Sequence, residues 1–232
     1  MEKLTSCLMK NQKTFRSLDL TTICPKLLAG NPCPYCYVEG AREAGYNAKI
    51  KYDRTAYTGG ILRLRKATIA KLNSTGGLRV FSFADYFPWM DKELMVIVAD
   101  AKKVGLKLKA VTKQAQFVHK FAQYFDIIHL SIDNIGHGVN WETAQRLRQQ
   151  YPNVLIRSVV LDESEIETLE KVSDIITLNH GKNDFQRFGP REREQLAQMF
   201  PGRVCGASES CLDCQVKCGQ AIVENKKDKL AC

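Results

Sequence analysis

Short apolar runs alternate with amphipathic stretches through most of this 232-residue chain. Runs rich in Val, Ile and Leu are typical of strands that are covered on both faces. They predict six strands, at residues 15–23, 78–84, 106–112, 126–133, 154–161 and 174–179. Amphipathic stretches predict six helices, at 60–73, 91–104, 114–124, 141–150, 163–171 and 190–199.

The stretch at 91–104 carries clear start and stop signals for a helix. Asp91 is expected to cap its first turn, with Glu93 close behind. Gly105 follows Lys102 and Lys103, as is common where a helix ends. This stretch is therefore expected to form a regular helix with defined ends.

The repeated strand–helix units predict a fold of the α/β class. Such units give parallel strands joined by right-handed crossovers. Six units are fewer than the eight of a closed barrel. We therefore expect a partial (βα)6 TIM-like barrel over residues 1–200. The composition changes after Pro201, which predicts a small cysteine-rich C-terminal extension over 201–232.

The charge balance favours anionic partners. The chain has 34 Lys and Arg residues against 25 Asp and Glu residues, a net charge of +9. A basic surface attracts nucleotides or nucleic acid, although a solvated basic face explains the same composition. Arg63, Arg65, Lys66 and Lys71 lie close together in the helix expected at 60–73.

The hydropathy pattern argues against a membrane protein. No apolar run approaches the roughly 18 residues that cross a bilayer, and the first residues lack the apolar core of a secretory signal. The expected location is the cytoplasm, where thiols stay reduced.

The nine cysteines fall into two clusters and two single positions. Cys24, Cys33 and Cys36 follow the first predicted strand with C-x8-C-x2-C spacing. The second cluster has C-x5-C-x2-C-x3-C spacing and consists of Cys205, Cys211, Cys214 and Cys218. In a reducing compartment such clusters favour metal binding over disulfides. Cys7 and Cys232 stand alone, and either could replace a member of a cluster.

The two clusters differ in the number of ligands that they supply. Three thiolates leave one position of a four-iron cluster open, whereas a zinc site would need a distant His or Cys. Four thiolates complete either a [4Fe–4S] cluster or a structural zinc site.

The first cluster resembles the signature of the radical S-adenosylmethionine (radical SAM) superfamily. The usual pattern is C-x3-C-x-aromatic-C; Cys33, Tyr35 and Cys36 match its second half, and the first gap is expanded to eight residues. The resemblance implies a [4Fe–4S] cluster whose open iron binds S-adenosylmethionine. It also implies that S-adenosylmethionine is cleaved reductively to give a 5′-deoxyadenosyl radical. The electron would come from a reductant such as flavodoxin or ferredoxin. The C-terminal cysteines would then hold an auxiliary [4Fe–4S] cluster.

Ligands of parallel α/β proteins bind where the strands end. Polar residues expected at this edge include Asp85, Thr112, Lys113 and Gln114. By the same resemblance, Ser131, Asp133 and Arg157 are candidates for contacts to the methionine moiety or ribose, and Tyr35 for the adenine.

The sequence leaves the substrate and two other classes of function open. Basic residues and the aromatic residues of 83–89 suggest an anionic substrate with a stackable ring, such as a nucleotide or nucleic acid. The alternatives are a non-catalytic zinc or iron–sulfur protein that binds nucleic acid, and an electron-transfer protein that does not bind S-adenosylmethionine.

Overall fold

The computed structural model describes residues 8–9, 17–20, 24–30, 33–34, 60–81, 85–178 and 188–205. Its central feature is a single sheet of eight strands in the order β1 to β8. The strands are β1 (Leu8–Met9), β2 (Ser17–Leu18), β3 (Leu78–Val80), β4 (Leu108–Thr112), β5 (Ile127–Ile132), β6 (Val154–Val160), β7 (Ile175–Leu178) and β8 (Val204–Cys205).

Helices connect the strands along the chain. The α-helices are α1 (Pro25–Leu28), α3 (Lys66–Asn73), α4 (Asp91–Val104), α5 (Ala115–Phe121), α6 (Trp141–Gln150), α7 (Ile166–Val172) and α8 (Pro190–Met199). Four short 3-10 helices accompany them: η3 (Ile61–Arg63), η4 (Pro88–Met90), η5 (Ala122–Tyr124) and η6 (Glu163–Glu165).

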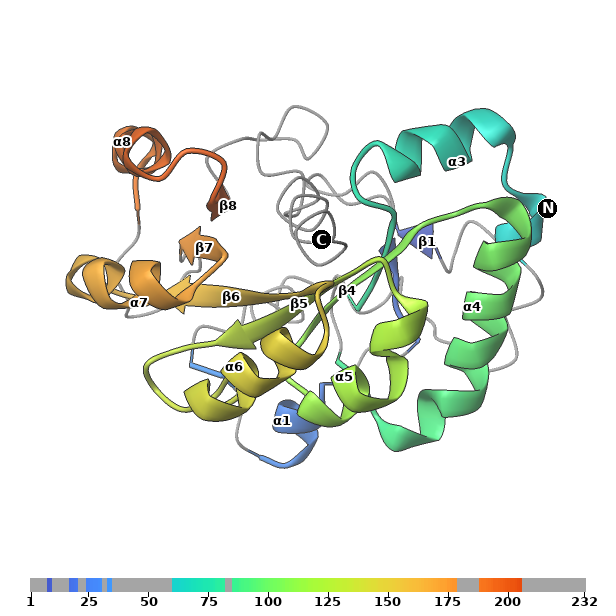
Figure 1. Ribbon diagram of the computed structural model, residues 1–232, viewed down its shortest axis with the longest axis horizontal. Helices are drawn as coiled ribbons and strands as arrows, with labels where there is room; N and C mark the ends of the chain where they lie inside the picture. Colours follow the sequence, from blue (N-terminus) through green and yellow to red (C-terminus); the bar gives the residue numbers. More distant parts are fainter. Residues whose placement is uncertain are drawn as a thin grey trace.

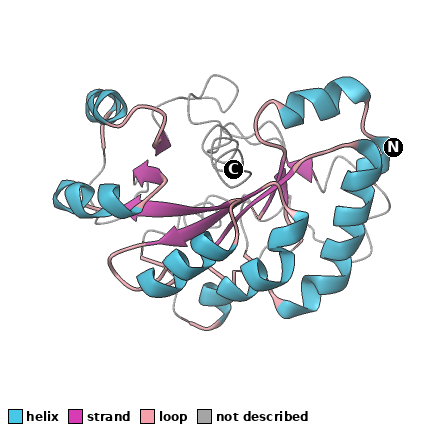
Figure 2. Cartoon of the chain, viewed as in Figure 1, coloured by secondary structure: helices cyan, strands magenta, loops and turns pink. Residues whose placement is uncertain are grey.

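The sheet is a curled half-barrel (Figure 1). Strands β2 to β8 are all parallel, and each pairs with the next in sequence; β1 runs antiparallel at the edge beside β2. A parallel sheet that always steps to the next strand in one direction places its crossover helices on one face. Figure 2 shows the helices between β3 and β7 along the outer side of the strands.

Each predicted strand and helix has a counterpart within the described part of the chain, where the structure also has helix α1 (Pro25–Leu28), which was not predicted. The six predicted strands correspond to β2 through β7, and the six helical stretches are present. Strands β1 and β8, of two residues each, were not predicted. The expected helix at 60–73 divides into η3 and α3, because Leu64 and Arg65 adopt extended backbone.

The predicted C-terminal end of α4 is confirmed, and the predicted N-terminal cap is wrong. Gly105 ends the helix in the left-handed conformation, with φ of 67°. Asp91, however, is the first helical residue, and Met90 occupies the cap position without a side-chain bond. The Asp91 carboxylate instead accepts hydrogen bonds from the Tyr86 hydroxyl and the Lys120 ammonium. Tertiary partners therefore outcompete the local capping bond.

Each strand presents alternate side chains to two different environments. On the outer face, residues such as Ile128, Leu130 and Ile132 of β5 join the main core under the helices. The opposite, inner face of the sheet carries Ser17, Arg79, Lys109, Val111, Ile127, His129, Ser131, Leu155, Arg157, Val159, Ile175, Thr177 and Cys205. The two faces thus differ sharply in polarity.

An aromatic cluster fills the core beneath α5. Phe117 is fully buried and lies 5.2–5.6 Å, between ring centroids, from four other rings, those of Phe81, Tyr86, Phe121 and Phe125. Edge-to-face and offset rings of this kind stabilise a core beyond the area that they bury.

Polar side chains that precede strands tie neighbouring strands together at the amino end of the sheet. Asp126 accepts from the backbone N–H of Leu108 at 2.8 Å, and Asp174 accepts from that of Ile156 at 2.9 Å. These bonds satisfy donors that the sheet ladder leaves open. The carboxylates at this end are therefore structural.

None of the helices in the described ranges is long and apolar enough to cross a membrane.

Candidate functional site

The inner face of the half-barrel is unusually polar for a sheet interior. Arg79 on β3 is in register with Lys109 on β4, and Ser131 on β5 is in register with Arg157 on β6. Lys109 is only 2% exposed, and its ammonium donates to the carbonyl of Thr75. Buried polar and charged groups are costly unless they are paired, so such a face is typical of a binding site.

Cys33 lies at the carboxyl edge of the sheet, where the parallel strands end. Its side chain is buried, and its Sγ is 2.9 Å from the Nζ of Lys113, which follows β4. The same Nζ is 3.7 Å from the Oδ2 of Asp133, which follows β5 and whose side chain is fully buried. A thiol from the first cysteine cluster therefore meets a cation–carboxylate pair at the predicted edge.

Asp85 fixes the turn that carries Lys113. Its carboxylate accepts hydrogen bonds from the Thr112 hydroxyl at 2.5 Å, the Lys113 backbone N–H at 2.8 Å and the Tyr86 backbone N–H at 2.7 Å. Burial raises the pKa of Asp85 above its ordinary value, against the lowering effect of these bonds and of the nearby Lys113 charge. Asp85 thus joins the end of β3 to the end of β4.

Asp133 organises the loop that follows β5. Its Oδ1 accepts from the backbone N–H groups of Ile135 at 3.2 Å and His137 at 2.9 Å. The loop then returns to the sheet, where the backbone N–H of Val139 donates to the carbonyl of Ser131 at 3.0 Å. Both oxygens of this predicted ligand residue are therefore engaged by protein groups.

Close approach of the loop to β5 depends on Gly138. A Cβ at this position would lie 2.6 Å from the carbonyl oxygen of Ser131 and from the Cα of Ile132. Real Cβ atoms do not approach backbone so closely, and the loop could not keep its place with a side chain there.

Arg157, on β6, contacts side chains of the last two strands, β7 and β8, across the inner face. Its Nε donates to the Thr177 Oγ1 on β7 at 2.6 Å, and its Nη2 lies 3.9 Å from the Sγ of Cys205 on β8. Ser131, its register partner on β5, is buried. Two of the predicted site residues, Ser131 and Arg157, are thus neighbours across adjacent strands, and a third, Cys205, contacts Arg157.

The predicted metal ligands fall partly outside the described residues. Cys24 precedes α1, Cys33 lies at the carboxyl edge and Cys205 lies in β8. Tyr35, Cys36, Cys211, Cys214 and Cys218 are outside the described ranges. Among described residues, no three His, Cys, Asp or Glu side chains form a group that could hold a metal ion. Both complete ligand sets remain predictions.

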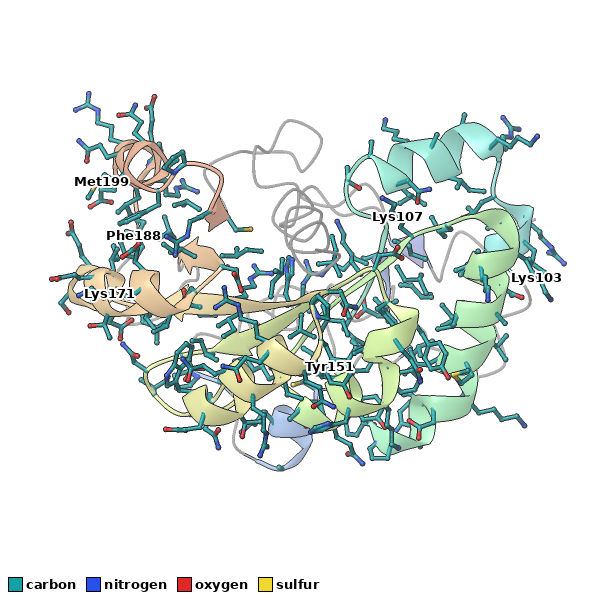
Figure 3. All side chains as sticks on the ribbon, in the orientation of Figure 1. Lys103, Lys107, Tyr151, Lys171, Phe188 and Met199 are labelled. Carbon is teal, nitrogen blue, oxygen red and sulfur yellow. The ribbon has the colours of Figure 1, made fainter. Side chains whose placement is uncertain are left out.

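A basic surface lies at the side of the molecule formed by η3, α3 and the end of α4. We define it by Arg63, Arg65, Lys66, Lys71, Lys102, Lys103 and Lys107. Asn73 holds its two halves together, because its side chain donates to the carbonyl of Gly105 and accepts from the backbone N–H of Lys107, both at 2.9 Å. Lys103 and Lys107 are labelled in Figure 3.

The sequence predicted most of the carboxyl-edge residues but not their connections. Asp85, Thr112 and Lys113 were expected there from their positions after strands, whereas the contact of Lys113 with Cys33 joins residues 80 positions apart. Phe81 was also missed. It has a positive φ of 66°, rare for a residue with a side chain, at the end of β3.

No protein-family model matches the chain, and a search of curated proteins finds no match either.

Proposed function

We propose that this protein is a radical SAM enzyme that cleaves S-adenosylmethionine reductively at a [4Fe–4S] cluster held by Cys24, Cys33 and Cys36. The observation that carries the proposal is the position of Cys33 at the carboxyl edge of a parallel half-barrel, 2.9 Å from the Lys113 ammonium. The C-x8-C-x2-C spacing supplies the rest of the argument.

The donor chemistry of the edge suits such a cluster. A thiolate ligand is stabilised by a nearby cation, and hydrogen bonds to cluster sulfurs adjust the reduction potential. When bound, the cluster supplies an electron and an open iron for the amino and carboxylate groups of S-adenosylmethionine. The chain's own part is to hold the thiolates, orient the sulfonium and exclude water.

Residues of the inner face are the proposed neighbours of S-adenosylmethionine. Ser131 and Asp133 lie at the end of β5, where Asp133 is 3.7 Å from the Lys113 ammonium, and Tyr35 is proposed for the adenine. Because Asp133 already accepts two backbone hydrogen bonds, we assign it a positioning role through Lys113 and its loop.

The C-terminal cysteines are proposed to hold a second [4Fe–4S] cluster. Cys205 enters the sheet as part of β8, so this centre would be anchored to the half-barrel. The proposed reaction requires reduced thiols and an electron donor such as flavodoxin or ferredoxin, which is in keeping with the cytoplasm.

The proposed substrate is anionic, a nucleotide or nucleic acid. The basic surface supports this, because its first part, residues 60–73, contains four basic side chains, those of Arg63, Arg65, Lys66 and Lys71, and no acidic one. If several phosphates are contacted, affinity falls steeply with salt, whereas a single nucleotide gives a shallow dependence. Binding of RNA, DNA and nucleotides at two salt concentrations distinguishes these cases.

Anaerobic reconstitution tests the proposed activity. The reconstituted protein, supplied with a reductant and S-adenosylmethionine, should form 5′-deoxyadenosine and contain about eight irons per chain. Replacing Cys24, Cys33 and Cys36 together by Ala should abolish the product and leave about four irons.

The comparison variant replaces Cys7 and Cys232, which the proposal leaves out of both clusters, and should leave activity and iron content unchanged; a loss of iron would show that one of them is a ligand. Product formation by the triple variant at the parental rate would contradict the assignment. A preparation with about four irons and one zinc would make the C-terminal site a structural zinc centre.

A further inference from the structure

Arg157 carries a half-buried guanidinium group on the inner face of the sheet. Within the described ranges, no carboxylate lies at ion-pair distance from it. Elsewhere, Arg148 pairs with Asp174 at 2.7 Å and Arg203 pairs with Glu170 at 2.9 Å. An anion beside a half-buried guanidinium would stabilise it, so the contacts of Arg157 are of interest.

The contacts of Arg157 point to one sulfur atom. Thr177 accepts from its Nε and thereby fixes the plane of the guanidinium, whose Nη2 lies 3.9 Å from the Sγ of Cys205. A thiol is neutral, but a thiolate that binds a metal is an anion. A metal-bound Cys205 thiolate would therefore give Arg157 a counter-charge.

The position of Cys205 agrees with this pairing. β8 places it in register with Thr177, near the carboxyl end of β7. It packs against an apolar cluster of Ile127, Leu155 and Ile175 on the inner face. These apolar side chains lower the local dielectric constant, which strengthens the attraction between a guanidinium and a thiolate.

We infer that Arg157 is a positioning and charge-compensating residue for Cys205, the ligand that β8 would contribute to the C-terminal metal centre. The inference rests on the proposed C-terminal centre, and it assigns Arg157 to Cys205 in place of S-adenosylmethionine. Cys205 and Arg157 both lie on the inner face, where Ser131 is in register beside Arg157.

A positive charge beside a ligand thiolate favours the reduced, more negative state of an iron–sulfur cluster. Removing the charge should therefore lower the midpoint potential of this centre without removing any of its ligands. A purely structural role for Arg157 predicts no such change in the folded, loaded protein.

The test uses the variant that lacks Cys24, Cys33 and Cys36, in which the C-terminal centre is the one that remains. Arg157→Met and Arg157→Lys are compared with Arg79→Met, which removes an inner-face guanidinium from β3, at the other side of the sheet. Iron content and the midpoint potential are measured, the latter by redox titration followed by electron paramagnetic resonance. The inference predicts equal iron in all variants, a lowered potential in Arg157→Met, recovery towards the parental value in Arg157→Lys, and no change in Arg79→Met.

A second variant covers the case in which Arg157→Met does not fold. Thr177→Val removes the acceptor that aims the guanidinium and should shift the potential in the same direction by a smaller amount. If the centre takes zinc, the protein is loaded with cobalt, and the thiolate-to-cobalt absorption should shift in Arg157→Met alone.

Three results would overturn the inference, and they differ in what else they affect. Equal potentials, or equal cobalt spectra, in Arg157→Met and Arg79→Met refute it and leave the two-centre proposal intact. A parent that binds neither iron nor cobalt refutes the C-terminal centre itself. With the first cysteine cluster restored, unchanged S-adenosylmethionine affinity in Arg157→Met supports the assignment, whereas weakened binding returns Arg157 to the S-adenosylmethionine site.

Discussion

Replacing Asp85 by Ala should strongly destabilise the carboxyl edge of the sheet. The carboxylate accepts from the Tyr86 N–H, the Lys113 N–H and the Thr112 hydroxyl, so three donors lose their acceptor together. An unsatisfied buried donor costs about 1–3 kcal/mol.

Two effects reduce the total below a simple sum. The Lys113 N–H is only partly buried, so water can replace part of its bond. Burial of the charged Asp85 carboxylate is itself unfavourable, as its raised pKa indicates, and the substitution removes this cost from the native state. We expect a net loss of about 2–4 kcal/mol in the free energy of unfolding, a large part of the 5–15 kcal/mol typical of a domain.

Urea denaturation followed by far-ultraviolet circular dichroism measures this loss. The matched control is Asp126→Ala, at the opposite end of β4, where one N–H, that of Leu108, loses its acceptor. It should cost about 1 kcal/mol. If Asp85→Ala is no more destabilising than Asp126→Ala, the three bonds do not act together and the proposed role of Asp85 is wrong.

Three further predictions concern the same edge. Because burial raises the pKa of Asp85 above its ordinary value of 3.8, the protonated form is favoured in the folded state. The stability that Asp85 contributes, relative to Asp85→Asn, should be fully present at a pH below 3.8 and should decline as the pH rises through the folded pKa. Denaturation midpoints of both proteins at several pH values measure this contribution. A difference between the two midpoints that does not change with pH would contradict the prediction. Gly138→Ala places a Cβ 2.6 Å from backbone of β5, which cannot move aside easily, and should cost about 3 kcal/mol or more in thermal or urea unfolding. Its control, Gly136→Ala, has open space but a φ of 74° and should cost only about 1–2 kcal/mol, so equal costs would argue against the close approach. Lys113→Met removes the cation beside Cys33 and should weaken iron binding at the first centre about 10–100-fold in chelator competition, with Lys113→Arg nearer the parent; unchanged iron retention would show that Lys113 does not support the site.

The order and type of the secondary-structure elements follow from local pattern. The strands β4 to β7 and the helix α4 are long enough for their apolar periodicity to specify them, and Gly105 ends α4 because glycine adopts positive φ without steric cost. Alternation of strand and helix also specified a parallel sheet. Local signals failed where they were weak: β1 and β8 have two residues each, and pairing with a neighbouring strand defines them.

The contacts that make the site were decided by the tertiary structure. Sequence position indicated that Lys113, Asp133 and Arg157 follow or belong to strands, but it carried no information on their partners. Lys113 meets Cys33 across 80 positions because parallel strands end at one edge of the sheet, and Arg157 meets Cys205 across 48 because β6, β7 and β8 lie side by side. Side-chain periodicity is a local property of the chain, whereas the pairing of a cation with a thiol depends on strand register, which is established only when the whole sheet assembles.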